Sequence, residues 1–352
     1  MRLRRSQCDE GGITRRRRGK GFSYAYANGR PVKDRKTLDR IRALAVPPAW
    51  TDVWICPWPN GHIQALGTDA AGRRQYRYHD DWRLHRDRQK FERVLDFAAV
   101  LPEIRAVVER DLSQDGLSRE RVLAATVRLL DIGLFRVGGE AYAEDNETFG
   151  VTSLRKEHVR IRKGVMVFCY PAKGAIERTI EIRDAKVRKV VEEVRRRRSG
   201  NGHLFAYKEE GRWIEVRAED TNAYIKDAAG GGEFSAKDFR TWSATVLTAT
   251  ALAENGAPET EREARHAVVE AIAEAANYLG NTPAVARSAY IDPRIIDRFE
   301  DGQTIAEWLP RLPKVETVSE ASTKNGGLRR TVEEAVIELI NDAVTESKTG
   351  AA

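Results

Sequence analysis

The sequence predicts an α+β fold, with a small β-rich domain at residues 1–90 and a larger, mainly helical domain at residues 91–313. Two observations support this division. Apolar and polar residues alternate in short runs between turn signals in the first part, whereas they recur at helical spacing after about residue 90. The 352 residues suffice for two domains, and residues 314–352 are expected to form a tail with a short amphipathic helix.

Charge also separates the two domains. Residues 1–90 hold 21 Lys and Arg against 9 Asp and Glu, and the remainder holds 39 against 44. A basic domain joined to a near-neutral one favours a polyanionic partner, and binding through phosphates would weaken steeply with salt. The alternative is that surplus arginine only keeps the chain in solution, and the isoelectric point alone does not distinguish the two.

The first domain is expected to begin with a strand at residues 22–26, which ends at the turn signal Asn28-Gly29. A helix should follow over residues 34–44, where apolar residues have helical spacing. The remaining strands are expected at residues 53–56, 62–66 and 75–79.

In the last of these strands, Tyr76 and Tyr78 share one face and Arg74 lies close by. Aromatic and basic side chains interleaved in this way can contact a DNA groove. The alternative is that both tyrosines occupy half-buried strand positions. The basic run at residues 15–18 could lie along phosphates or form a solvated tail.

The second domain is expected to begin with two helices separated at Pro102, followed by a third that Ser118 caps and that ends just before Arg136. The turn Pro171 to Gly174 should carry Lys173 between two strands. The strands of this domain are expected at residues 159–161, 165–169 and 178–182.

Two further helical patterns, over residues 241–253 and 263–278, frame the other polar candidates. They place Arg240 at a helix start and Asn281 just beyond a helix end. In the tail, residues 318–327 are expected to be a flexible linker, and a helix should follow at residues 331–344. Whether that helix docks on the rest of the chain is left open.

Tyr290 is the candidate nucleophile. A phenol can hold a covalent phosphodiester, so attack by Tyr290 would split strand breakage into two reversible transfers. Arg136 and Arg240 offer planar forks of donors that match phosphate oxygens and keep their charge. Lys173 could protonate a departing sugar oxygen, and Asn281 offers an amide donor to the same phosphate.

Each candidate also has an ordinary structural explanation. Tyr290 could be a packing residue, Lys173 a turn lysine, and the two arginines could pair with nearby carboxylates. Lys237, close to Arg240, could likewise be a surface charge. Their occurrence together, in this order, favours the chemical explanation.

Three segments carry a resemblance to a known family. Residues 136–150 begin Arg-Val-Gly-Gly-Glu-Ala-Tyr, residues 237–242 read Lys-Asp-Phe-Arg-Thr-Trp, and residues 280–290 end in Tyr290. In these segments the chain resembles the type IB DNA topoisomerases, in particular the short poxvirus-like form found in bacteria. The resemblance extends from about Arg15 to about Phe299.

The resemblance implies a catalytic domain of the tyrosine recombinase and type IB topoisomerase type, which forms a C-shaped clamp with the first domain. Tyr290 would attack a DNA phosphate, form a 3′-phosphotyrosyl link and release a 5′-hydroxyl strand. Arg136 and Arg240 would stabilise the transition state, and Lys173, at a hairpin tip, would be the general acid. Asn281 stands where many members have histidine, and an uncharged amide should lower the rate modestly.

The same resemblance implies relaxation of double-stranded DNA without ATP or metal, because the phosphotyrosyl bond stores the energy of the broken strand. DNA contacts are expected at Arg74, Tyr76, Tyr78, Tyr142 and Lys237, although core packing is an equal alternative for Tyr142. No cofactor is expected, since the chain has no Gly-x-x-x-x-Gly-Lys loop. A monomer is the family expectation.

Two other functions fit part of this pattern. A tyrosine recombinase or integrase uses a related set of residues, but usually has a histidine shortly before the second arginine and a helical DNA-binding domain in front. Here Lys237-Asp-Phe precedes Arg240 and the first domain is β-rich, which favours a topoisomerase. The other alternative is a DNA-binding clamp that lost the reaction, and Asn281 leaves that possibility open.

Cysteine usage and hydropathy predict a cytoplasmic, nucleoid-associated protein. Cys8, Cys56 and Cys169 show no Cys-x-x-Cys spacing, so neither a disulfide framework nor a metal site is expected. No stretch approaches the roughly 20 apolar residues of a membrane span, and the arginine-rich start lacks the apolar core of a signal peptide.

Overall fold

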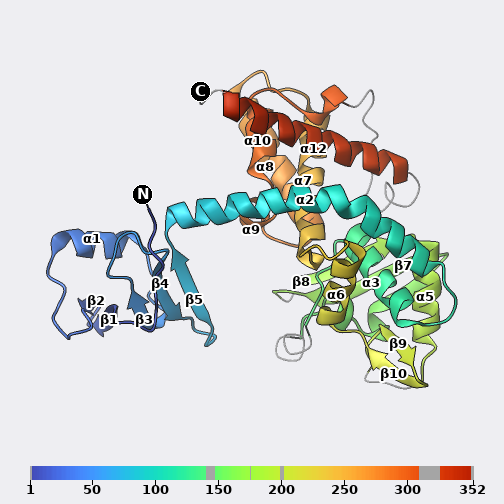
Figure 1. Ribbon diagram of the computed structural model, residues 1–352, viewed down its shortest axis with the longest axis horizontal. Helices are drawn as coiled ribbons and strands as arrows, with labels where there is room; N and C mark the ends of the chain where they lie inside the picture. Colours follow the sequence, from blue (N-terminus) through green and yellow to red (C-terminus); the bar gives the residue numbers. More distant parts are fainter. Residues whose placement is uncertain (1, 140–146, 175, 199–201, 309–325, 350–352) are drawn as a thin grey trace. The chain divides into compact units, whose positions relative to one another are not determined.

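Two units, each with its own hydrophobic core, make up the chain in a computed structural model: Met1–Glu92 and Arg93–Ala352 (Figure 1). The structure describes residues 2–139, 147–174, 176–198, 202–308 and 326–349. The first unit is built around a β-sheet and the second is mainly helical with two small sheets, so the predicted α+β fold class is confirmed. Within the described ranges, no helix is long and apolar enough to cross a membrane.

Five antiparallel strands form the sheet of the first unit, in the order β2-β1-β3-β4-β5. The strands are β1 Ile13–Arg18, β2 Gly21–Ala25, β3 Thr51–Ile55, β4 Ile63–Thr68 and β5 Arg74–Tyr78. Helix α1 (Arg35–Ala43), which Asp34 caps, contributes Ile41 to a core that also holds Ile13 and Ile55. The predicted helix and the three later strands are confirmed.

The basic run at residues 15–18 belongs to strand β1 and is not a tail. It pairs with β2 through a tight turn, so the strand predicted at residues 22–26 has its main partner upstream, and only a short antiparallel bridge between Ala25 and Pro31 forms across the turn at Asn28-Gly29. Arg15 lies over the Phe22 ring and donates to the carbonyl oxygens of Pro47 and Trp50, at 3.0 and 2.6 Å. Arginine stems cover apolar surface in this way, which makes a run of four arginines compatible with a strand.

Helix α2 (Asp80–Leu112) is continuous through Pro102, where the sequence predicts a break. A proline inside a helix removes one hydrogen bond and bends the axis, and α2 bends along its course in Figure 1. Phe97, Leu101 and Ile104 are buried in one core on both sides of the proline. Because these residues are buried in the same core, the helix continues past the missing hydrogen bond at Pro102.

Helices make up most of the second unit, and Ser118 caps α3, the helix after α2, as predicted, accepting from the Arg121 amide at 3.3 Å. The helices are α3 Arg119–Gly133, α5 Ala185–Arg195, α6 Ala218–Ala228, α7 Ala236–Asn255, α8 Glu261–Leu279, α9 Pro283–Ala289 and α10 Pro293–Glu300. Short 3-10 helices are η1 Val151–Ser153, η2 Lys156–His158 and η3 Ile305–Trp308. The sequence missed α6 and the hairpin of β9 (Ala206–Glu209) and β10 (Arg212–Glu215), which are too short to show a clear period.

A three-stranded antiparallel sheet, of β6 (Val159–Arg162), β7 (Val165–Ala172) and β8 (Ile176–Ile182), carries Lys173 in its last turn. The sequence starts that turn at Pro171, but β7 continues to Ala172. Pro171 fits because its backbone faces away from β8: its carbonyl accepts from the Phe149 amide at 2.9 Å. The proline therefore removes no hydrogen bond from the β7–β8 pair.

Helix α12 (Gly326–Thr349) contains the predicted tail helix, and it docks on the second unit, where it packs against α7 and α10. The linker predicted at residues 318–327 lies almost wholly outside the described residues. A buried network of charges holds the helix: Asp131, at the end of α3, and Glu333, in α12, both bind Arg105 and Arg329. Arg105 reaches Asp131 at 2.9 Å and Glu333 at 2.6 Å.

Burial alone would raise the pKa of the Asp131 carboxyl, but the charges of Arg105 and Arg329 outweigh it and hold that pKa well below its usual value. A carboxyl whose pKa is lowered by folding stabilises the protein above its unfolded pKa, and this contribution declines below about pH 4.

We therefore expect Asp131→Asn to lower the free energy of unfolding by about 3–5 kcal/mol at neutral pH, because it removes a buried carboxylate that two partly buried arginines share. The difference in unfolding free energy between the variant and the native protein should become smaller below about pH 4. Urea unfolding over a pH series measures both effects. Asp115→Asn, which removes an exposed pair with Lys189, is the control and should change little; an equal loss in the two variants would contradict the prediction.

Candidate active site

Three arginines from different elements meet the last carbonyl groups of α8. Arg240 donates to the Leu279 carbonyl at 2.8 Å, and Arg136 donates to the Gly280 carbonyl at 3.2 Å. Arg178, from β8, donates to the carbonyls of Tyr278 and Leu279 at 2.6 and 3.0 Å. A helix end leaves such acceptors unpaired and carries partial negative charge, so it attracts cations.

These acceptors orient the guanidinium groups without neutralising them. In the part of the chain that the structure describes, no carboxylate lies within ion-pair distance of Arg136, Arg178 or Arg240. The carbonyl oxygens carry only partial negative charge, so they do not cancel the charges of the three guanidinium groups, which lie close to one another. Such a cluster is suited to an anion with several oxygens, such as a phosphodiester.

Arg240 is the most deeply buried of the three, with 3% of its surface exposed. It lies one turn into α7, and a second bond, to the Leu134 carbonyl, joins it to the end of α3. Burial and the nearby charge of Arg136 lower its pKa to about 10, so the group stays protonated at neutral pH. Its Nε has no hydrogen-bond partner among the described residues.

Tyr290 lies against Arg240, with its ring centroid 5.4 Å from the guanidinium carbon. It ends the short helix α9, which Thr282 caps, and its amide donates to Ala286 at 3.0 Å. Burial alone would raise the pKa of the Tyr290 hydroxyl. The charge and hydrogen bonding of Arg240, and the charges of Arg136 and Lys237, outweigh that effect and lower the pKa.

Thr245 holds the backbone on the carboxyl side of Tyr290. Its hydroxyl accepts from the Asp292 amide at 3.1 Å and donates to the Tyr290 carbonyl at 3.4 Å or to the Thr241 carbonyl at 3.1 Å. Thr245 is fully buried and lies on α7 a little more than one turn beyond Arg240. One helix therefore positions both the cation and the backbone of the tyrosine.

Asn281 directly follows the αL residue Gly280 that ends α8, as predicted, and its side-chain oxygen accepts from Arg136. Its Nδ2 is buried and has no acceptor among the described residues. Asn281 Nδ2 and Arg240 Nε are thus two buried donors without a partner in the described ranges.

Lys173 lies in the β7–β8 turn, as predicted, and is exposed. The structure thus brings Tyr290, Arg136, Arg240 and Asn281 together and leaves Lys173 at the tip of the hairpin from which Arg178 reaches α8. Lys237 is exposed at the start of α7 and acts on Tyr290 through its charge. Tyr142 lies outside the described residues.

The candidate contacts in the first unit share one face of β5. Tyr76 and Tyr78 are 42% and 40% exposed, and their rings stack with centroids 6.0 Å apart. Arg74, two residues before Tyr76, is exposed on the same face. The tyrosines line a hollow of about 580 Å³, to which Arg77 and Arg83 add positive charge.

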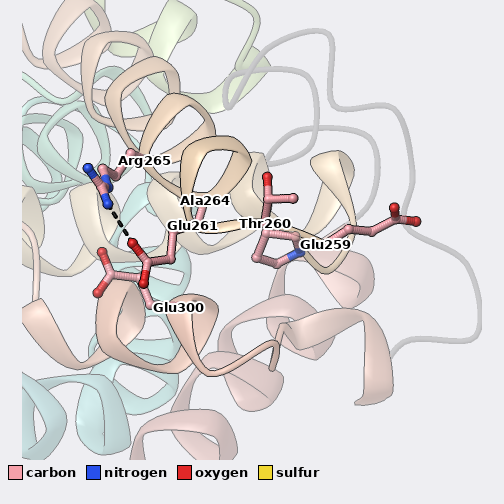
Figure 2. A pocket seen from close by; sticks show the side chains of 7 residues that line it. Glu259, Thr260, Glu261, Ala264, Arg265 and Glu300 are labelled. Atoms are coloured by element: carbon pink, nitrogen blue, oxygen red, sulfur yellow. Dashed lines mark hydrogen bonds and ion pairs between the residues drawn. The ribbon is translucent and has the colours of Figure 1, made fainter.

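The opposite end of α8 has the opposite chemistry. Glu259, Glu261 and Glu300 line a hollow of about 400 Å³ at the amino end of the helix, where Arg265 pairs with Glu261 (Figure 2). Carboxylates there suit the positive end of the helix dipole and would repel a phosphate. Side chains of opposite charge therefore lie at the two ends of α8, and of these two ends only the carboxyl-terminal end favours an anion.

Sequence reasoning missed Arg178 and Thr245. Alternation along β8 places Arg178 on the inward face with Ile180 and Ile182, but no signal in the sequence shows that this face meets α8. Thr245 lies within an apolar helical pattern, where a threonine usually bonds its own helix.

Comparison with known proteins gives the family. A family model described as eukaryotic DNA topoisomerase I, catalytic core, matches residues 79–307, and one described as bacterial DNA topoisomerase IB, N-terminal domain, matches residues 21–69. The chain is 32% identical to DNA topoisomerase 1B of Acanthamoeba polyphaga mimivirus, over 82% of this chain and 88% of that protein. The chain belongs to the type IB DNA topoisomerases.

More distant matches agree with this assignment. DNA topoisomerase 1B of vaccinia virus (strain Copenhagen) is 22% identical over 42% of this chain and 48% of its own length. DNA topoisomerase 1 of Drosophila melanogaster is 30% identical, over 46% of this chain and 16% of that protein. A solved XerH site-specific recombinase bound to palindromic difH matches with a TM-score of 0.36 and 16% identity, over 57% of this chain and 49% of that one, which is too weak to support an argument.

The first prediction from this site concerns the acidity of Tyr290. We expect Tyr290 to titrate below about 10, the usual tyrosine value, and Lys237→Met to raise its pKa because one nearby positive charge is lost. NMR of ring-labelled tyrosine measures the titration, and Tyr290→Phe assigns the signal. Lys226→Met, which removes an exposed lysine of α6, should leave it unchanged; equal shifts in both variants would exclude a local effect.

The second prediction concerns Thr245. Thr245→Val keeps the shape but leaves the buried Asp292 amide without an acceptor, so we expect it to cost about 1–3 kcal/mol of unfolding free energy and to shift the Tyr290 NMR signal. Thr248→Val is the matched control, because Thr248 is equally buried on α7 but bonds only the Ala244 carbonyl. Equal effects of the two substitutions in urea unfolding and NMR would show that Thr245 has no special role.

Proposed function

We propose that this topoisomerase relaxes supercoiled duplex DNA by cleaving and resealing one strand through Tyr290. The observation that carries the proposal is the position of Tyr290 against a cluster of arginines that main-chain carbonyls orient and no described carboxylate neutralises. Family membership supports the reaction class, and the geometry supports the assignment of roles to residues.

In the proposed first step, the Tyr290 oxygen forms a bond to the phosphorus of a DNA phosphodiester as the bond to the 5′ oxygen breaks. Lys173 donates a proton to that oxygen, and the 3′ end stays linked to Tyr290. The phenol proton goes to solvent, and Lys173 stays neutral until resealing returns its proton, so the proton count balances. Because the pKa of Tyr290 is lowered, less free energy is needed to form the attacking phenolate.

Arg136 and Arg240 would hold the non-bridging oxygens, whose charge grows in the transition state. Loss of one such donor typically costs about 100- to 1000-fold in rate. The free Nδ2 of Asn281 and the free Nε of Arg240 would provide two more donors to the same group. These cations supply the charge stabilisation that divalent metals provide in many other nucleases, so the proposed reaction needs no metal.

Resealing would be the reverse transfer: the 5′ hydroxyl attacks the phosphotyrosyl bond and Lys173 takes back the proton as general base. The energy of the broken strand stays in that bond, so no ATP is required. Torsion in the DNA provides the direction, since rotation of the free end releases supercoils before the strand is rejoined.

We further propose that the first unit binds the duplex through Arg74, Tyr76 and Tyr78 on the exposed face of β5. Stacked, exposed aromatic rings beside arginines suit contact with sugar, phosphate and base edges. Closure of both units as a clamp, a monomeric state and a place on the nucleoid in the cytoplasm remain parts of the proposal.

The decisive test is relaxation of negatively supercoiled plasmid in EDTA without ATP. We expect the native protein to relax the plasmid and Tyr290→Phe to have no activity, because phenylalanine offers no oxygen. The control is Tyr207→Phe, a buried tyrosine of β9 far from α8 in sequence, which should remain active. Relaxation by Tyr290→Phe would exclude Tyr290 as the nucleophile. If the native protein binds plasmid at low salt but never relaxes it, the enzyme proposal is wrong and the alternative of a non-catalytic DNA-binding clamp is supported.

A further inference from the structure

The hairpin that carries Lys173 is anchored at two places, both of them close to its tip. On β7, the Tyr170 ring stacks on Phe135, the residue before Arg136, with centroids 5.7 Å apart. On β8, Arg178 bonds two consecutive carbonyls at the end of α8. Tyr170 and Arg178 are direct partners in the strand register, so the two anchors lie opposite one another.

The Arg178 anchor is a close contact. The chain at Gly280 has a φ of +60°, and a Cβ built there would lie 3.0 Å from the Arg178 Cδ. A side chain at position 280 would therefore be strained and would press on the arginine stem. Glycine at this position both ends α8 and leaves room for Arg178.

Arg178 is held at an electrostatic cost. Burial and the nearby charge of Arg136 lower its pKa, as expected for a cation without a carboxylate partner. An apolar residue or a glutamine on this strand would avoid that repulsion, so stability alone does not explain an arginine here. Its two parallel donors match two consecutive carbonyls, which a lysine cannot do with the same geometry.

We infer that Arg178 is a positioning residue, which fixes the Lys173 turn relative to the Tyr290 segment. Lys173 lies on an exposed turn and has no other described link to α8, whereas Arg178 follows it by five residues on the adjoining strand. The carbonyls that Arg178 binds belong to the helix end from which the chain continues through Asn281 to Tyr290. This inference rests on the proposed function, in which Lys173 is the general acid.

The inference predicts that loss of Arg178 impairs protonation of the leaving oxygen and leaves attack by Tyr290 nearly intact. A substrate whose 5′ bridging oxygen is replaced by sulfur separates these effects. A thiol has a pKa of about 8.5, far below that of an alcohol, so sulfur leaves without a proton. Any variant that fails only in proton donation should recover on the sulfur substrate.

The experiment measures single-turnover cleavage of matched oxygen and sulfur duplexes by the native protein, Lys173→Ala, Arg178→Gln and Arg178→Lys. On the oxygen substrate, we expect Lys173→Ala to lose at least about 100-fold and Arg178→Gln about 10- to 100-fold, as a misplacement of about 1 Å can cause. On the sulfur substrate, both should come within a few-fold of the native rate. Arg178→Lys keeps the positive charge but cannot form both hydrogen bonds to the two carbonyls, so it should resemble Arg178→Gln.

Two controls keep the outcomes distinct. Arg119→Gln breaks a partly buried 3.5 Å pair between α3 and Asp220 of α6, which does not involve the β7–β8 hairpin, and it should leave the ratio of the two rates unchanged. Gly280→Ala disturbs the Arg178 anchor and also the carbonyl that binds Arg136, so it should lose rate on both substrates and show the pattern of a non-selective defect. Circular dichroism confirms that each variant is folded.

Equal impairment of Arg178→Gln on both substrates, or full activity on both, would overturn the inference while the proposed function stands. A native protein that cleaves neither substrate, or a Lys173→Ala that does not recover on sulfur, would instead overturn the roles assigned to Tyr290 or Lys173. The inference would then fail with them.

Discussion

The catalytic cluster depends on one kind of interaction, the hydrogen bonds from guanidinium groups to the last carbonyls of α8. Arg136 arrives from beyond α3, Arg178 from β8 and Arg240 from α7, and all three end at the same turn of helix. A helix end must find donors for its last carbonyls in any fold. Here those donors are the charged groups that the proposed reaction uses, so one set of hydrogen bonds both completes the helix and assembles the candidate site.

This arrangement explains why the arginines are both fixed and charged. A carboxylate partner would orient an arginine equally well, but it would neutralise the positive charge. A phosphate would then have to compete with the carboxylate for the arginine. Carbonyl oxygens provide direction and only partial charge. Uncompensated positive charge affects both groups: it adds to burial in lowering the pKa of Arg240, and it outweighs burial in lowering the pKa of Tyr290.

Much of this could be predicted from the sequence, and the failures have a common cause. The cap at Ser118, strand alternation and the position of Asn281 are local features, and they agree with the structure, whereas the helix that carries Arg240 begins earlier than expected, at Ala236. Pro102 within a helix and the arginine run in β1 contradict local preferences, because packing of neighbouring residues outweighs them. Arg178 could not be predicted, because its role depends on which helix its strand meets.

The bond between Arg136 and Gly280 joins positions 144 residues apart. Other members are also far apart, since Arg240 follows Arg136 by 104 residues, so no short segment of the chain contains the whole cluster. During synthesis, the residues of the anion-binding cluster emerge long before Tyr290, which comes near the end of the catalytic region. Domains fold as units once their sequence is available, so a growing chain that stops before Tyr290 has the arginines without the proposed nucleophile. Under the proposed mechanism, the sequence separation of the cluster keeps an unfinished chain from cleaving DNA.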